Sequence, residues 1–255
     1  MIRCRHWRRA GVEGLTGVAR AGQTPWHSHR HAIFGFVDSG GQTIELRTRA
    51  AVVAPGMGFV LPRGLAHRCL YPGEARYRIL ALDTDRPLAF AVFASPSWAA
   101  TFDRAFDAFG RPGAVEADRL IDAAAAYSTG AISPRRSAPP FVEQSLAELD
   151  ADLEDAKRLS DLARRQGLSP FYLQRTFLRH VGLTPSQARV VARVRASRLR
   201  LADGMRPTEV AYLCGFADQS HLTRMFAAFM GVTPRRYQRQ VARAAGHAQI
   251  ALIDQ

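Results

Sequence analysis

The feature that most constrains this chain is an internal repeat in its last third. Ala163 and Gly167 return 48 positions later as Ala211 and Gly215. A second set returns 49 positions later, with Leu173, Phe177, Gly182, Thr184 and Pro185 recurring as Leu222, Phe226, Gly231, Thr233 and Pro234. Each copy predicts a short helix, a turn that contains glycine and a second helix. One extra residue is inserted in the second turn.

Local signals support each piece of this repeat. In the first copy Gly167 is suited to the left-handed backbone that ends a helix. Ser169 is a favourable N-cap, and Pro170 fits the first turn that follows it. Asp218 is predicted to cap the second helix of the other copy. Thr184-Pro185 and Thr233-Pro234 predict that a new helix starts after each unit.

The second helix of each unit has an apolar face and a polar face. Spacings of three and four residues place leucine and phenylalanine inward and leave two outward sets: Phe171, Gln174 and Arg175 in the first copy, and Gln219, Ser220, Thr223 and Arg224 in the second. Arginine can bond to guanine and glutamine to adenine in the major groove, which admits a helix. These residues are the predicted DNA contacts. The alternative is that they are solvated polar faces on core helices.

The charge is concentrated in the same region. Residues 1–155 hold 18 basic and 17 acidic residues, whereas residues 156–246 hold 17 basic and only 4 acidic ones. A neutral first part joined to a basic second part is typical of a sensor or partner domain attached to a domain that binds a polyanion. A solvated basic surface is the alternative.

Residues of about 140 to 242 resemble the DNA-binding domain of the AraC/XylS family of transcription regulators. The matching residues lie in the second unit, at Val210-Ala211, Gly215-Phe216, Leu222, Arg224, Phe226 and Gly231 through Tyr237. The resemblance implies seven helices, with a connector at about 185–202 that holds two recognition helices roughly 34 Å apart on one face of promoter DNA. It implies base contacts from the outward residues named above, except Thr223, which periodicity alone adds. RNA polymerase is an expected partner if the protein is an activator; repression is the other outcome.

The first hundred residues predict a small β-barrel or sandwich. Short β-rich runs are expected at 32–37, 43–46, 51–53, 58–61 and 76–82, separated by Gly and Pro. His27, His29 and His31 alternate, so an extended strand would point all three the same way. Gly56-x5-Pro62-x-Gly64-x2-His67 is similar to the second motif of the cupin superfamily, and Gly22-x4-His27-x-His29 approximates the first.

The resemblance to cupins implies a sensor domain, and its histidines leave the effector open. Where metal cupins carry an acid after the first two histidines, this chain has Ile33 or Phe34. The set His27, His29, His31 and His67 remains, with Cys69 as a further candidate ligand, for a divalent metal such as Zn²⁺ or Ni²⁺. An organic effector in the barrel, or no small ligand at all, are the alternatives. A metal-dependent cupin enzyme with an accessory DNA-binding domain is the rival function; the missing acid favours a protein that is not an enzyme.

Between the two parts, residues 96–139 predict helices and then a linker. Apolar residues spaced by three and four begin at Trp98 and again at Leu120, which suits either a homodimer interface or packing on the barrel. The stretch 133–140, rich in Ser, Pro and Arg, is the predicted linker.

The expected class is therefore an α+β multidomain protein. A cupin-like barrel spans 1–95, a helical dimerisation segment with linker spans 96–139, and an all-α domain of two helix-turn-helix units joined by a long helix spans 140–245. The first residues lack the apolar core of a signal peptide, no run is long enough for a membrane span, and three cysteines make no disulfide framework. We expect a cytoplasmic regulator that does not contact membranes.

Overall fold

A computed structural model of the 255-residue chain describes all residues except 1, 10–11, 109–114, 128–137, 154–158 and 251–255. Contacts divide the chain into two compact units. The first comprises Met1–Thr24, His29–Ile132 and Arg239–Gln255, and the second comprises Pro25–Ser28 and Ser133–Gln238. Most of the predicted linker, residues 133–137, lies outside the described residues. Among the described residues no helix has the length and hydropathy to cross a membrane.

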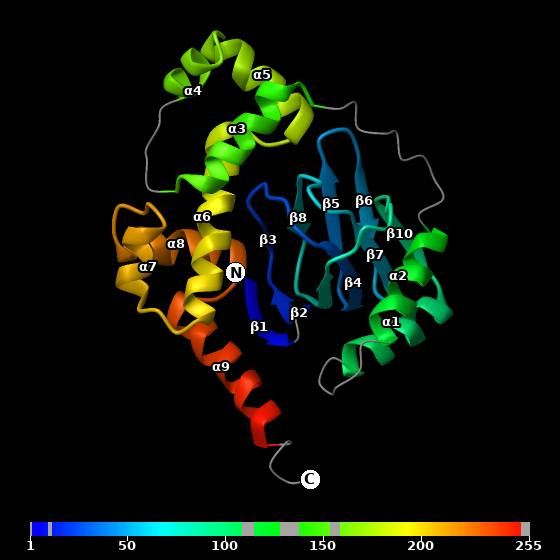
Figure 1. Ribbon diagram of the computed structural model, residues 1–255. Helices are drawn as coiled ribbons and strands as arrows, with labels where there is room; N and C mark the ends of the chain where they lie inside the picture. Colours follow the sequence, from blue (N-terminus) through cyan, green and yellow to red (C-terminus); the bar gives the residue numbers. More distant parts are fainter. Residues whose placement is uncertain (1, 10–11, 109–114, 128–137, 154–158, 251–255) are drawn as a thin grey trace. The chain divides into compact units, whose positions relative to one another are not determined.

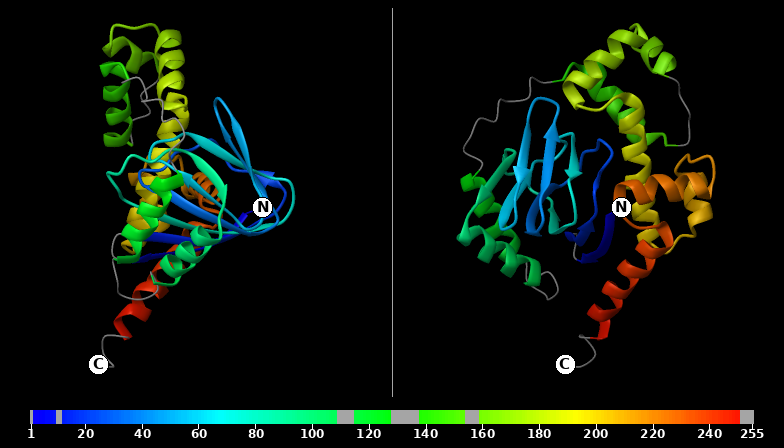
Figure 2. Two further views of the ribbon diagram at one scale, coloured as in Figure 1. Left: turned by 90° about the vertical axis from the view of Figure 1, so that its right-hand side faces the viewer. Right: turned by 180° about the vertical axis from the view of Figure 1, so that it is seen from behind.

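The first unit is built from two antiparallel sheets (Figures 1 and 2). The six-stranded sheet has the order β1-β2-β9-β4-β7-β10. Its strands are β1 Ile2–Arg9, β2 Val12–Ala19, β4 Ala32–Ser39, β7 Met57–Leu61, β9 Ala75–Leu82 and β10 Ala91–Ala94. The four-stranded sheet has the order β3-β8-β5-β6, from β3 Gly22–Gln23, β5 Gln42–Leu46, β6 Ala50–Val53 and β8 His67–Tyr71. This is the predicted cupin-like β domain.

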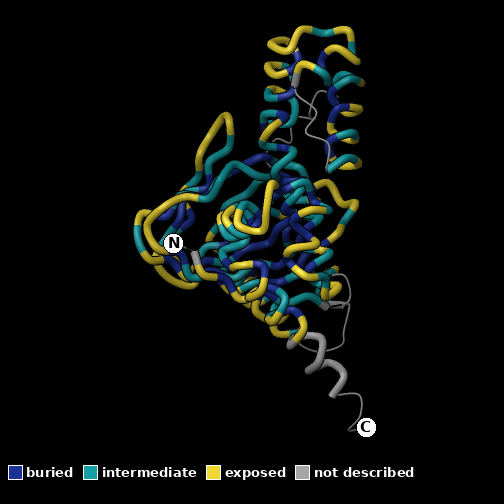
Figure 3. The backbone as a smooth tube through the Cα atoms, turned by 90° about the vertical axis from the view of Figure 1, so that its left-hand side faces the viewer, coloured by how far each residue is buried: buried dark blue, intermediate teal, exposed yellow. Residues whose placement is uncertain are grey.

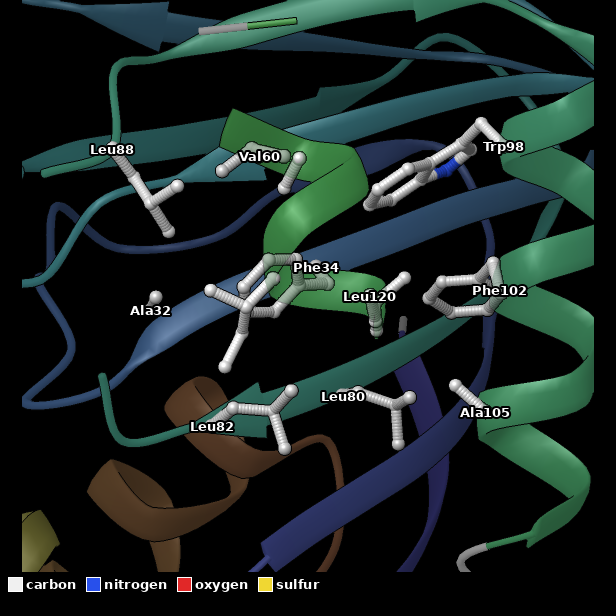
Figure 4. Packing of buried hydrophobic residues seen from close by; sticks show 12 residues of the cluster. Ala32, Phe34, Val60, Leu80, Leu82, Leu88, Trp98, Phe102, Ala105 and Leu120 are labelled. Atoms are coloured by element: carbon white, nitrogen blue, oxygen red, sulfur yellow. The ribbon is translucent and has the colours of Figure 1, made fainter. Parts of the chain in front are cut away.

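Two helices cover the outer face of the six-stranded sheet. They are α1, Pro96–Ala108, and α2, Val115–Tyr127. Trp98 and Phe102 of α1 lie against Phe34 and Leu80 of the sheet (Figure 4). Gly58 makes this possible, because a Cβ there would lie 2.1 Å from Nε1 of Trp98. Burying each aromatic side chain contributes about 1.5–3 kcal/mol.

The apolar faces of α1 and α2 are thus used within the protomer. Trp98, Phe102, Leu120 and Ala124 are all at most 1% exposed. Of the two explanations that the sequence pattern allowed, packing on the barrel accounts for these residues.

A separate apolar core lies between the sheets. It includes Ile33, Ile44, Val53, Phe59, Leu61, Tyr71 and Tyr77. Burial alternates along β8: His67, Cys69 and Tyr71 are buried, and the residues between them are not. These three residues therefore lie on the face of β8 that lines the interior. In Figure 3 the buried positions follow the strands while many connecting turns are exposed.

The second unit contains the repeated helices. Its elements are α3 Pro140–Ala151, α4 Leu159–Arg165, α5 Pro170–Val181, α6 Pro185–Ala202, α7 Pro207–Leu213, α8 Gln219–Met230 and the start of α9 Pro234–Ile250. Helix α6 has the bounds that the sequence predicted for the connector. The predicted caps are confirmed: Ser169 accepts from the Tyr172 N–H, and Asp218 from the His221 N–H. Both α5 and α8 end at a left-handed glycine, Gly182 and Gly231.

Side-chain contacts of helix α6 reach the end of α3 and the residues that follow it. Arg193 Nε donates to the Leu153 carbonyl, 2.9 Å away, and Arg195 pairs with Asp150 at the end of α3. Gly215, in the turn of the second pair, faces the same carbonyl. These contacts tie α3, α6 and the second turn together.

One prediction about the barrel is wrong. His27, His29 and His31 do not lie on a continuous strand, because residues 24–31 form the connection between β3 and β4. Without a regular pleat, alternation no longer places all three rings on one side. Strands β1, β2, β3, β8 and β10 were not predicted, whereas the five expected runs correspond to β4, β5, β6, β7 and β9.

Candidate functional sites

The first candidate reading face lies on α5. Leu173 and Phe177 are fully buried and fix the helix against its neighbours. Gln174 and Arg175 are exposed, and Phe171 is 75% exposed at the start of the helix. A large apolar side chain left in solvent beside two donors is unusual on a domain surface and is suited to contact with a thymine methyl group.

The second candidate face lies at equivalent positions on α8. Leu222 and Phe226 are fully buried, and Gln219, Ser220 and Arg224 are exposed. Thr223 differs from the other predicted contacts, because it is partly buried and its hydroxyl donates to the Gln219 carbonyl at 2.8 Å. Its methyl group remains available for a base, and its hydroxyl oxygen can still accept a hydrogen bond but has no proton left to donate.

The arginines of the helical unit differ in their surroundings. A structural partner within the unit is found for several of them, among them Arg164, Arg165, Arg193, Arg195 and Arg206. Arg175, Arg224, Arg235 and Arg236 are exposed, and within the described residues none of the four has an ion pair. A polyanion would therefore meet guanidinium groups on α5, α8 and the first turn of α9 without displacing an acidic partner.

The second candidate site is a cluster of histidines at one end of the barrel. One ligand atom from each of His27, His29 and His67 lies within 4.8 Å of the others. Contacts group Pro25–Ser28 with the second unit, but this loop starts and ends on barrel strands. Two hydrogen bonds hold the connection between β3 and β4 to the barrel. The Thr24 hydroxyl accepts from the Cys69 N–H of β8 at 2.9 Å. The His29 carbonyl accepts from the Gly64 N–H at 2.8 Å.

Local hydrogen bonds orient two of the rings. His27 Nδ1 lies 2.8 Å from the Pro25 carbonyl, and His67 Nδ1 lies 2.9 Å from the Leu65 carbonyl. If these nitrogens carry the proton, Nε2 of each ring is left as the lone-pair donor. Burial lowers the pKa of His27, although its bond to Pro25 acts in the opposite direction. The neutral form, which is the form that ligates metals, is therefore favoured.

The remaining predicted ligands do not join this cluster. His31 Nδ1 instead lies 3.8 Å from the Asp83 carboxylate. Cys69 lies on the same inward face of β8 as His67, but it is not part of the cluster, and burial raises the pKa of its thiol to about 12. Within the described residues, the cluster holds three imidazoles and no carboxylate.

Comparisons with known proteins agree with both halves of the chain. The family described as an AraC-like ligand binding domain matches residues 9–149, and the family described as a helix-turn-helix domain matches residues 162–240.

Curated relatives match over shorter stretches. The transcriptional regulator GbdR of Pseudomonas aeruginosa is 30% identical over 97 residues, which are 38% of this chain and 26% of GbdR. RipA of Corynebacterium glutamicum is 33% identical over 116 residues, or 46% of this chain and 35% of RipA. YbfI, a regulator of Bacillus subtilis described as uncharacterized, is 36% identical over 64 residues, or 25% of this chain and 23% of YbfI. The chain thus spans between about a quarter and a third of the length of these relatives.

A similarity of fold extends over nearly the whole chain. The crystal structure of ToxT from Vibrio cholerae covers 89% of this chain and 98% of its own, with a TM-score of 0.60 and 12% identity. At that identity the likeness shows the fold alone. Since the AraC-like ligand binding domain matches more than half of the residues and is followed by a helix-turn-helix domain, this chain belongs to the AraC family of regulators.

Proposed function

We propose that this protein is a sequence-specific DNA-binding transcription regulator controlled by a small effector in its N-terminal barrel. The observation that carries the proposal is the pair of equivalent helices α5 and α8, each held by a buried core and each presenting an exposed arginine beside other polar side chains. The curated relatives, which match over parts of this chain, are named as transcriptional regulators.

The electrostatics of the helical unit supports the same conclusion. Exposed arginines on α5, α8 and α9 supply charge for phosphate contacts, which set affinity and its salt dependence. Base contacts from Gln174, Arg175, Gln219, Ser220 and Arg224 would supply specificity. The aromatic ring of Phe171 adds an apolar contact.

Selection of bound sequences from random double-stranded DNA tests this proposal. We expect the purified protein to enrich a motif with two elements about one helical turn apart. A general nucleic-acid binder would enrich no sequence. That result would overturn the proposal even if the affinity for DNA were high.

An organic molecule is the effector that we propose first. The space between the two sheets is lined by an apolar core, and barrels of this kind commonly hold small ligands. One ToxT structure, 10% identical with a TM-score of 0.57, is described as bound to an unsaturated fatty acid. Effector binding would shift the population of protein arrangements and so change occupancy of spaced DNA sites.

A divalent metal is the second candidate effector, favoured by the histidine cluster. Three neutral imidazoles suit a borderline cation such as Zn²⁺ or Ni²⁺. His27 and His67 meet the requirement that the second ring nitrogen be held by a hydrogen bond. The bound metal would supply a cationic centre, and these side chains would hold it at the end of the barrel.

Metal titration by calorimetry tests this candidate. We expect Zn²⁺ or Ni²⁺ to bind one site per chain and His67→Ala to abolish that binding. His31→Ala is the matched control, because His31 lies outside the cluster, and it should bind metal as the wild type does. Equal loss in both variants, or no binding by the wild type, would exclude a site at His27, His29 and His67.

The rival function is a cupin enzyme with an accessory DNA-binding domain. Within the described residues the cluster offers no carboxylate as a fourth ligand or acid–base group, so we propose that the protein is not an enzyme. Turnover of a substrate that His67→Ala abolishes would contradict this.

We also propose that the protein acts in the cytoplasm as a homodimer and contacts RNA polymerase if it activates transcription. The resemblance to the family supports these partners. The outer faces of α1 and α2 are the surfaces to test, since their apolar faces are already buried on the barrel. Sedimentation of the full chain at micromolar concentration should give twice the monomer mass. A monomer with and without DNA would refute the dimer.

A further inference from the structure

Gln42 is buried inside the barrel, where the residue is 2% exposed. Within the described residues, neither Nε2 nor Oε1 of its side chain has a hydrogen-bond partner. In the part of the chain that the structure describes, it is the sole side chain with two such atoms. Buried polar groups are nearly always paired in folded proteins, so an amide that lacks both a donor and an acceptor contact indicates a missing partner.

The strand register places this amide in the barrel interior. Gln42 lies on the same face of β5 as Ile44, a member of the inner core, and opposite Val53 of β6 in the same core. The register that pairs Thr43 with Leu70 puts Gln42 opposite Tyr71 on the other side. The amide therefore faces the interior between the sheets.

Two tyrosines belong to the same inner core as Ile44 and Val53, the neighbours of Gln42. The rings of Tyr71 and Tyr77 stack with centroids 5.8 Å apart, and the Tyr77 hydroxyl lies 3.7 Å from Cys4 Sγ. Burial is the main cause that raises the pKa of both tyrosines. Both phenols consequently stay protonated and can donate or accept hydrogen bonds.

Formal charge is absent from the buried residues that the structure describes, since no Asp, Glu, Lys or Arg is among them. The buried imidazoles of the first unit are those of His6 and His67. An ionised ligand would lose its hydration here without meeting a side chain of opposite fixed charge, which is costly. A neutral group that both donates and accepts would meet no such penalty.

We propose that Gln42 binds the neutral head group of an organic effector, a carboxamide or lactam whose N–H and C=O pair with the two atoms of the side-chain amide. This proposal rests on the proposed function and defines its ligand as uncharged, with an apolar body that lies against the inner core. Gln42 is the residue that sets specificity for the head group, and Tyr71 is its neighbour across the strand pair.

Thermal unfolding of the full chain with octanamide or octanoate at pH 8 tests this proposal. Ligands that bind the folded state raise Tm. We expect millimolar octanamide to raise the Tm of the wild type and octanoate, which is ionised, to raise it less. Gln42→Leu should abolish the rise with octanamide. Thr43→Val is the matched control on the opposite face of β5, and it should keep the rise.

The ligand-free proteins give a second readout. Replacing an unpaired buried amide with an apolar side chain of similar size should stabilise the barrel, so Gln42→Leu without ligand should unfold about 2–4 °C above the wild type. The proposal is overturned if Gln42→Leu unfolds below the wild type, which would indicate a structural partner such as a buried water. It is also overturned if octanamide gives no shift, if its shift survives in Gln42→Leu, or if octanoate shifts Tm more. None of these outcomes alters selection from random DNA by the ligand-free wild type, which tests the proposed function separately.

Discussion

The two helix-turn-helix units share their framework and differ on their outward faces. Helices α5 and α8 have 12 residues each, a polar N-cap and a left-handed glycine after the last turn. At the second helical position, however, α5 has Phe171 where α8 has Ser220, and Gln174 corresponds to Thr223. Only the arginines, Arg175 and Arg224, are the same. The repeat preserves what the fold needs and varies the residues that we propose as DNA contacts, so we expect the two units to read different bases.

The largest predicted effect concerns the shared framework. Leu173→Ala and Leu222→Ala remove fully buried side chains at equivalent positions, and each should lower the free energy of unfolding by about 2–5 kcal/mol. Urea unfolding monitored by circular dichroism measures this. Similar losses would support equivalent cores, whereas a loss in one unit alone would show that the two are not built alike.

Alanine at the glycine of each helix-turn-helix turn should destabilise the protein by unequal amounts. Gly167 and Gly215 both have positive φ, 65° and 70°, so alanine at either costs about 1–2 kcal/mol in backbone strain. At Gly215 the new Cβ would also lie 2.0 Å from the Leu153 carbonyl oxygen, whereas nothing lies within 4 Å at Gly167. Overpacking should add about 1–3 kcal/mol to Gly215→Ala alone. Equal unfolding midpoints for the two variants would contradict the described contact of the second turn with Leu153.

Replacing the exposed arginines of α5 and α8 should weaken DNA binding and leave the stability of the protein unchanged. Arg175→Ala and Arg224→Ala should each cost roughly 1–3 kcal/mol of binding at the preferred site and relax preference at a different base pair. Arg164→Ala, in α4, and Arg206→Ala, at the residue directly before α7, are matched controls because each arginine already has an acidic partner. Fluorescence anisotropy with specific and random duplexes measures the difference. Equal loss on both duplexes would mean that Arg175 and Arg224 contact phosphate only.

The smallest effect is expected at the caps. Ser169 and Asp218 each accept one backbone N–H at the start of α5 and α8. Alanine at either position should destabilise the protein by about 1 kcal/mol, because one N–H of the first turn loses its partner. Thermal unfolding measures this, and no change in either variant would show that solvent replaces the cap.

The helical unit could be predicted in detail because its signals are local. Caps, first-turn prolines and apolar spacing identify α6 at Pro185–Ala202 and both recognition helices. The exposure of polar side chains on α5 and α8 could likewise be inferred from periodicity alone. The hydrogen bond from the Thr223 hydroxyl to Gln219 could not be predicted, since it depends on the rotamer of Thr223.

The barrel was less predictable because its strands pair over long distances. Strand β1 has alternating inward residues, with Cys4 and His6 buried between exposed arginines, but this pattern could not be distinguished from a basic terminal segment. The three histidines at the end of the barrel come from two segments that only folding brings together. The burial of Gln42 could not be predicted from the sequence, because a polar residue after two glycines is typical of a turn.

The most direct test of the central claim is to make the two outward faces alike. Phe171→Ser together with Gln174→Thr gives α5 the residues that α8 has at two corresponding positions, while Arg175 already matches Arg224 and Pro170 stays where α8 has Gln219. Selection from random DNA should then yield a motif whose first element has changed to resemble the second, with the second element unchanged. An unchanged motif, or a uniform loss of affinity without a change of sequence, would contradict the account in which these two helices read DNA.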